Sequence, residues 1–210
     1  MKNTQKNEKI IMESKQKSNK AASKQSASDE ANTLSKIRIG LETGTRSKVI
    51  AELNLSIANA SVLNVKTKKV HWDVVGPQFR SLHQLLDENY EMLSAMVDAI
   101  AERARMLGGH TIGTMVDFVE HSELTESRQV YNRSTEAVHV LVADHETVVR
   151  QVRKSVDACD ELGDAGTADM LTGMLRQHEQ ILWMLRSFVE GESVVPAGDA
   201  KTLLSAKIKN

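Results

Sequence analysis

Two pairs of potential metal ligands lie on one predicted helix, at spacings that suit metal binding. His83 and Asp87 are four residues apart, and so are Asp98 and Glu102. Residues four apart project from one helical face, so each pair is a workable half of a metal site. The eleven residues from Asp87 to Asp98 turn a helix about three full times, which puts both pairs on one stripe. Imidazole and carboxylate together suit iron, with zinc and manganese as alternatives.

One metal ion cannot contact both pairs within a single chain, because their midpoints are roughly 22 Å apart along a helix axis. If this helix crosses its own copy in antiparallel orientation near residues 92–93, the first pair of one chain faces the second pair of the other. Two-fold symmetry then generates two identical sites per dimer, separated by about the same 22 Å. His71, at the end of the preceding predicted helix, can add an imidazole to the first half-site.

The spacing of these residues does not establish a metal site by itself. A lone pair of this kind on a long helix is usually part of a solvated face, so both interpretations stay open at this point. The single cysteine, Cys159, excludes an intrachain disulfide and fits a reducing compartment. The pattern contains no thiolate ligands, which argues against a structural zinc or iron–sulfur site.

Four long segments with helical periodicity must position these side chains. Only 3% of the residues are aromatic and two are proline, a composition that favours an all-α fold. A short helix at 115–120 lies within the long connection between the second and third segments, which indicates a four-helix bundle with one crossover. Thr167 is expected to cap the fourth helix. Apolar residues recur near i, i+3 and i+4 over residues 45–72, 78–107, 126–161 and 168–190.

The ends of the chain differ in composition from the middle. Residues 1–44 are rich in Lys, Ser, Gln and Asn, so we expect a mostly disordered tail before the helical domain at 45–190. Residues 191–210 are expected to form a second flexible tail. The first tail is either a solubilising segment or a basic arm that binds DNA without sequence preference. The lysines among its first thirty residues are Lys2, Lys6, Lys9, Lys15, Lys17, Lys20 and Lys24.

The run from Lys68 to Gly109 closely resembles the Dps family (DNA-binding proteins from starved cells), whose members are ferritin-like. Weaker family features stand at Thr167–Leu171 and Leu182-Trp183, so the resemblance covers roughly residues 45–190. Asp73 stands where many members carry Asn, which changes no expected ligand. The residues that carry the resemblance are His71-Trp72, Gly76-Pro77, Phe79, Leu82-His83, Asp87, Asp98 and Ala101-Glu102-Arg103.

The resemblance implies a hollow homo-dodecamer with an iron site, mononuclear or di-iron, at each two-fold interface. His71, His83 and Asp87 would come from one subunit, and Asp98 and Glu102 from its partner. The implied activity is that of a ferroxidase that oxidises Fe(II), preferably with hydrogen peroxide, and stores ferric iron inside the shell, which protects DNA. A nucleoid-compacting protein that binds DNA through its lysine-rich tails is the alternative function.

Several other polar residues have weaker interpretations. Glu136 and His139 form a single Glu-x-x-His, for which a surface or packing role is favoured because no second copy is found. His145 and His178 have no convincing partners by spacing. The acidic residues of the turn between the third and fourth segments are either simply exposed or draw Fe²⁺ into a pore. They are Asp157, Asp160, Glu161, Asp164 and Asp169.

The sequence also bears on where the protein works. No apolar run approaches the roughly 18–20 residues that span a bilayer. The lysines near the N-terminus are not followed by an apolar stretch, so the segment is not typical of a secretory signal. We therefore expect a soluble, cytoplasmic protein without a membrane partner, associated with the nucleoid if it binds DNA.

Overall fold

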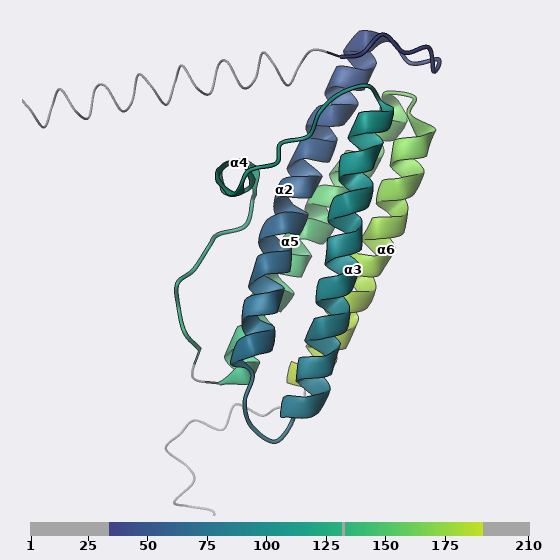
Figure 1. The fold of residues 1–210 in the computed structure, drawn as a ribbon. Helices are drawn as coiled ribbons and strands as arrows, with labels where there is room; N and C mark the ends of the chain where they lie inside the picture. Colours follow the sequence, from purple (N-terminus) through teal and green to yellow (C-terminus); the bar gives the residue numbers. More distant parts are fainter. Residues whose placement is uncertain (1–33, 132, 191–210) are drawn as a thin grey trace, which may run out of the picture.

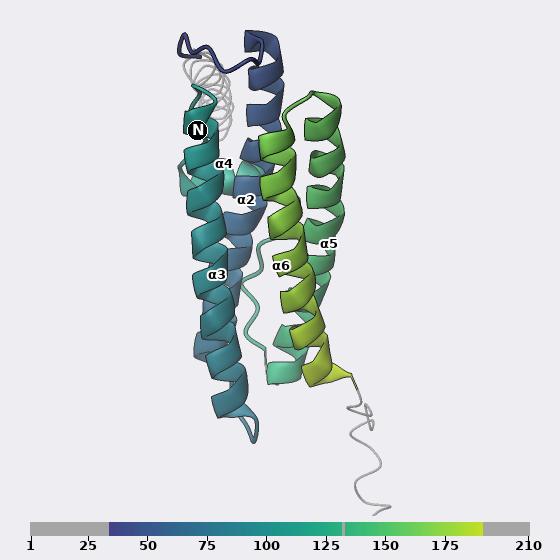
Figure 2. The same ribbon diagram turned by 90° about the vertical axis from the view of Figure 1, so that its right-hand side faces the viewer.

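A computed structural model describes residues 34–131 and 133–190, and every regular element among them is a helix. Both predicted tails lie largely outside these residues. Four long helices run side by side as a bundle, while α4 (Met115–His121) lies to one side of it, on the connection between α3 (Phe79–Met106) and α5 (Ser134–Glu161) (Figures 1 and 2). The predicted all-α bundle with one crossover and a short helix is confirmed. The helices are α2 (Thr43–Asp73), α3 (Phe79–Met106), α4 (Met115–His121), α5 (Ser134–Glu161) and α6 (Ala165–Val189).

Two helix starts differ from the prediction. The third long helix, α5, begins at Ser134 rather than at 126, and the backbone N–H of Gln129 donates to the Ser127 hydroxyl in the irregular segment before it. The predicted cap at Thr167 is wrong, because α6 begins earlier and Asp164 caps it. The Asp164 carboxylate accepts from the backbone N–H of Thr167 at 3.0 Å. An aspartate before the first turn competes well with threonine for this role.

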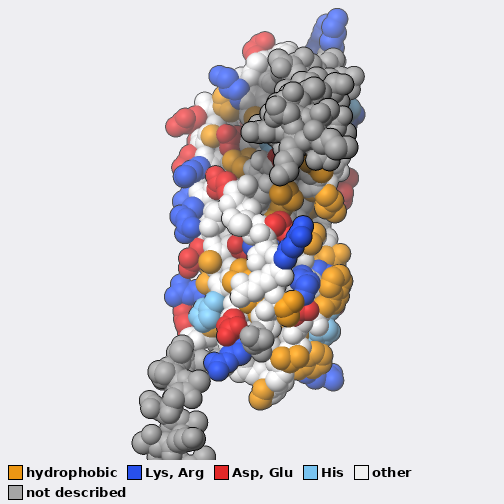
Figure 3. Space-filling view, turned by 90° about the vertical axis from the view of Figure 1, so that its left-hand side faces the viewer, with side chains coloured by type: hydrophobic (Ala, Val, Ile, Leu, Met, Phe, Trp, Pro, Cys, Tyr) orange, Lys and Arg blue, Asp and Glu red, His pale blue; other side chains and the backbone are white. Residues whose placement is uncertain are grey.

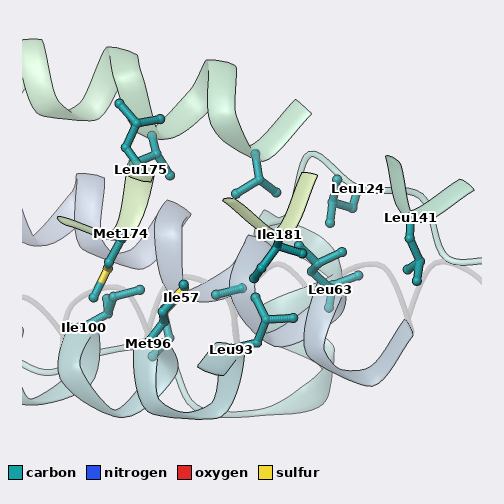
Figure 4. Packing of buried hydrophobic residues seen from close by; sticks show 14 of the residues in the cluster. Ile57, Leu63, Leu93, Met96, Ile100, Leu124, Leu141, Met174, Leu175 and Ile181 are labelled. Atoms are coloured by element: carbon teal, nitrogen blue, oxygen red, sulfur yellow. The ribbon is translucent and has the colours of Figure 1, made fainter. Parts of the chain in front are cut away.

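The core of the bundle is built from one apolar stripe of each long helix. Close to the middle, side chains from α2, α3 and α6 meet, as Figure 4 shows for Ile57, Leu93, Met174 and Ile181. Burying a Leu, Ile or Met side chain contributes about 1.5–3 kcal/mol, so this cluster is the main source of stability. The largest apolar side chains buried completely include Leu53, Leu63, Leu86, Leu93, Ile100, Leu141, Leu171, Ile181 and Leu185.

Residues 34–42, just before α2, lie against the C-terminal end of α3. The backbone N–H of Ser35 donates to the carbonyl of Gly108 at 2.7 Å. Arg46, which is 3% exposed, donates to the carbonyl of Leu107 at 2.7 Å. Gly108 has φ +83°, and a Cβ there would come within 2.9 Å of the Arg46 guanidinium, so the turn requires glycine.

Polar contacts attach the crossover connection to the bundle. The Lys66 ammonium of α2 is 2.7 Å from the Asp144 carboxylate of α5 and donates to the carbonyl of Thr125 at 2.8 Å. The Asn59 side-chain oxygen accepts from the Ser122 hydroxyl at 2.8 Å. These contacts hold the connection over α2. Within the described residues, we find no helix that is both long and apolar enough to cross a membrane.

Candidate metal centre

His71 and His83 face each other across the turn between α2 and α3. Nδ1 of His71 is 2.9 Å from the carbonyl oxygen of His83, and Nδ1 of His83 is 2.9 Å from the carbonyl oxygen of His71. The two rings are stacked, with centroids 3.7 Å apart and an interplanar angle of 24°. Gly76 in the turn has φ +98°, a conformation that glycine adopts without strain. The turn therefore fixes both imidazoles relative to each other.

The reciprocal contacts determine which ring nitrogen can bind a metal ion. A carbonyl oxygen can only accept, so each Nδ1 must carry the hydrogen and donate it. The Nε2 atom of each neutral imidazole then keeps its lone pair, which is the form that coordinates metals. His71 is buried and His83 is half-buried, so neither ring rotates freely. Both rings are held in the tautomer that a metal site needs.

Asp87 lies beside the two rings, one turn after His83 on α3. Its Oδ1 is 3.8 Å from Nε2 of His71 and 2.7 Å from the Lys68 ammonium. The hydrogen bond from Lys68 is the main cause that lowers the pKa of Asp87 below its usual 3.8. Lys68 also lies over the ring of Tyr90, 4.3 Å from its centroid. The carboxylate is thus ionised at neutral pH and already paired with a cation.

Asp98 and Glu102 lie farther along α3, and both are exposed. At 1.5 Å per residue, Asp98 is about 16 Å from Asp87 along the helix. Within the described part of a single chain, no three His, Cys, Asp or Glu side chains form a group that could hold a metal ion. The structure therefore places His71 next to both His83 and Asp87 without closing the three side chains into a metal-binding group, and it leaves Asp98 and Glu102 farther along α3.

Large apolar side chains are exposed near the half-site and on α4. Figure 3 shows hydrophobic side chains gathered on the lower right of the face that contains α4. An exposed group of large apolar residues on a folded chain commonly marks a contact with another chain. The exposed apolar residues of α2, α4 and the α2–α3 region are Val65, Trp72, Val75, Phe79, Met115, Val116 and Val119.

The sequence did not lead us to predict that Lys68 pairs with Asp87 in this site. Lys68 precedes His71 by three residues, which puts the two on one face of α2. That spacing was the available signal, but its meaning depends on the register between α2 and α3. The other missed feature is the pair of histidine-to-backbone hydrogen bonds, for which the sequence carries no signal.

The other candidate residues from the sequence are the Glu136/His139 pair and the acidic residues of the turn between α5 and α6. Glu136 and His139 are both exposed on the first turns of α5. In the acidic turn, Asp164 is only 3% exposed and accepts a 2.6 Å hydrogen bond from Arg103, so it has a structural role. The other acids of the turn are all exposed; they are Asp157, Asp160, Glu161 and Asp169.

The comparisons with known proteins agree with this fold. Residues 50–193 match the model of the Ferritin-like domain family. An uncharacterized low temperature-induced protein of Nostoc sp. strain PCC 7120 is 52% identical over 164 residues, which are 78% of this chain and 92% of that protein. DNA protection during starvation protein 2 of Bacillus anthracis is 34% identical over 143 residues, covering 68% of this chain and 97% of that protein.

Solved structures give the same result. One is the crystal structure of the DPS protein from Vibrio cholerae O1, described as a member of a broad superfamily of ferritin-like diiron-carboxylate proteins. It resembles this chain with a TM-score of 0.69 and 26% identity, over 73% of this chain and 96% of that one.

Proposed function

Because this chain belongs to the Dps family of ferritin-like proteins, we propose that it is a ferroxidase whose iron sites are shared between two subunits. The observation that carries the proposal is the fixed group of His71, His83 and Asp87. Two imidazoles with free Nε2 atoms and one ionised carboxylate form an incomplete ligand set for iron. Asp98 and Glu102, which are exposed on α3, are the groups of a partner chain that would complete this ligand set.

The ligand set suits oxidation of its substrate, Fe(II). Carboxylates stabilise Fe(III) more than Fe(II), because an anionic oxygen interacts more strongly with the higher charge. Two Fe(II) ions give up one electron each to hydrogen peroxide, whose O–O bond breaks. Two protons are then taken up and two waters form, so no hydroxyl radical is released. A two-fold partner contributes the carboxylates that bring the ligand number to five.

We further propose that twelve chains assemble into a hollow shell that stores the ferric product in the cytoplasm. Light scattering should give the mass of a dodecamer, and stopped-flow absorbance should show faster oxidation of Fe(II) with peroxide than with O₂. A monomer or dimer in solution, or equal slow rates with both oxidants, would contradict this proposal. Metal analysis after anaerobic loading tests zinc and manganese as substitutes.

Lys68 is expected to weaken iron binding, because its ammonium occupies the Asp87 oxygen that would ligate the metal. Replacing it in Lys68→Met should raise the apparent affinity for Fe(II) about two- to fivefold, the range of an exposed ion pair. The measurement is an anaerobic calorimetric titration with Fe(II). The matched control is Lys69→Met, since Lys69 pairs with Asp73 on the same helix away from the half-site. An unchanged affinity in Lys68→Met would show that Lys68 does not compete with iron.

A second function is favoured by the lysine-rich N-terminal tail and by the name of the Bacillus anthracis relative, which refers to DNA protection during starvation. We propose that the tails bind DNA through its phosphates, as nucleoid-associated proteins do. Deleting residues 1–30 should abolish a gel shift of linear DNA while leaving the rate of Fe(II) oxidation unchanged. The shift of the intact protein should weaken steeply between about 50 and 200 mM salt. A shift that survives the deletion would place DNA binding elsewhere.

A further inference from the structure

Arg103, which follows the proposed ligand Glu102 on α3, connects that helix to the turn between α5 and α6. Its Nε donates to the Thr167 hydroxyl at 2.8 Å, and its Nη2 donates to the Asp164 carboxylate at 2.6 Å. Both acceptors are buried, with Thr167 0% and Asp164 3% exposed. Figures 1 and 2 show the α5–α6 turn and the C-terminal end of α3 at the same end of the bundle. One guanidinium therefore joins α3 to the α5–α6 half of the bundle.

The two acceptors form a fixed anchor for this guanidinium. The Asp164 carboxylate also accepts from the Thr167 backbone N–H at 3.0 Å and from the Thr167 hydroxyl at 2.6 Å. The backbone N–H of Asp164 donates to the carbonyl of Cys159 at 3.0 Å, which closes the turn. A Cβ at Gly166 would come within 3.0 Å of Nη2 of Arg103, so the guanidinium packs closely against this glycine. A planar guanidinium with two hydrogen bonds to fixed acceptors has little freedom to rotate or slide.

Arg103 holds α3 from a side that its other polar contacts do not reach. Figure 4 shows the apolar side chains of Ile100 and Met174 next to each other between α3 and α6, and apolar burial is not directional. Without Arg103, directional contacts would hold α3 from the α2 side alone. Among the described residues, the other side-chain hydrogen bonds that link α3 and its C-cap to a long helix run to α2, and they involve Arg46, Asn64, Lys68 and His71.

A small rotation of α3 matters because Asp98 and Glu102 have to reach a metal ion bound by another chain. Adjacent residues of a helix point about 100° apart, so an anchored Arg103 fixes the direction in which Glu102 projects. A carboxylate about 6 Å from the helix axis would move by about 1 Å if the helix turned by about 10°. A misplacement of about 1 Å in a reactive site can cost about 100-fold in rate. We propose that Arg103 is a positioning residue that aims Asp98 and Glu102 at the shared iron site.

The test uses shells in which each complete iron site takes its two halves from different chains, so this inference rests on the proposed function. Asp98→Ala/Glu102→Ala chains supply the histidine half, and His83→Ala/Asp87→Ala chains supply the acidic half. Adding Arg103→Ala to the chains that supply the acidic half should lower the rate of Fe(II) oxidation at least about tenfold. Adding it instead to the chains that supply the histidine half should change the rate less than about twofold, because those chains already lack both acids. Anaerobic calorimetric titration with Fe(II) should show the same chain dependence as weaker binding.

The comparison of the two placements separates positioning from stability. A general loss of folding or assembly would lower the rate whichever chain carried Arg103→Ala. Arg103→Lys keeps the charge but not the planar fork, so it should cause a smaller loss with the same chain dependence. The matched control is Arg105→Ala in the chains that supply the acidic half, because Arg105 donates to the Gly109 carbonyl at its own helix end. This control should keep the rate of the co-assembled shells.

Two results would contradict the proposal, and they differ in what else they contradict. Equal rates with Arg103→Ala in either kind of chain would overturn the positioning role alone. Co-assembled shells that stay inactive even with Arg103 intact would overturn the shared iron site, and the positioning role with it.

Discussion

Replacing His83 and Asp87 together by alanine should slow the rapid oxidation of Fe(II) by hydrogen peroxide by roughly 100-fold or more. These two side chains and His71 are the only proposed ligands that the described structure brings together, with His71 and His83 tied to each other's backbone. Removing an imidazole and the ionised carboxylate leaves one imidazole on this side of the site. The measurement is stopped-flow absorbance of the ferric product, with assembled protein at a fixed ratio of iron to chain.

A matched control exists on the same helix. Gln84 and Glu88 are also four residues apart and exposed, and the Gln84 amide donates to the Glu88 carboxylate at 3.0 Å. Gln84→Ala/Glu88→Ala removes a polar pair of the same spacing without touching a proposed ligand, so its oxidation rate should stay near that of the unchanged protein. If both double variants slowed equally, the effect would come from the helix rather than from the ligands.

Acidification should destabilise the bundle through a buried histidine pair, His145 of α5 and His178 of α6, whose Nδ1 atoms are 3.2 Å apart. The pKa of His178 is lowered to about 4 because burial disfavours its charged form, and the pKa of His145 lies well below 6.5 for the same reason. Below pH 6.5 the unfolded chain takes up protons that the folded chain does not. The free energy of unfolding is therefore not reduced by these histidines above pH 6.5, and it falls as the pH drops below that value. For His178 the loss down to about pH 4 amounts to about 3 kcal/mol.

The melting temperature measured from about pH 7 to 5 at constant protein concentration tests this effect. It should fall more steeply in the unchanged protein than in His145→Leu/His178→Leu, in which neither group titrates. His139→Gln is the control, because His139 is exposed and its replacement should leave the slope unchanged. Equal slopes in all three proteins would mean that the buried pair does not set the acid stability.

The fold was largely predictable because its helices are long and their apolar residues are regularly spaced. Residues such as Val49, Leu53 and Ile57 recur at helical intervals along α2 and are buried. The helix ends were less predictable, since they depend on local polar contacts. Asp164 displaced Thr167 as the cap of α6 because its carboxylate is held between that backbone N–H and Arg103.

The candidate site, too, was predictable from the sequence only in part. Helix geometry alone predicted that Asp98 lies too far from Asp87 to share a metal within one chain, and both residues do lie on one continuous helix, α3. The contact of Lys68 with Asp87 could not be predicted, because it depends on how α2 and α3 are aligned. The same holds for His145 and His178, which are 33 residues apart and meet only because α5 and α6 pack against each other.

The central claim is that each iron site takes ligands from two chains, and complementation tests it most directly. His83→Ala/Asp87→Ala chains and Asp98→Ala/Glu102→Ala chains are each expected to form inactive shells. In a dimer of one of each, one site lacks all four ligands and the other is complete. Shells assembled together from equal amounts should therefore recover about a quarter of the unchanged oxidation rate. Preassembled shells that are merely mixed should stay inactive. Co-assembled shells as inactive as either variant alone would contradict a site shared between chains.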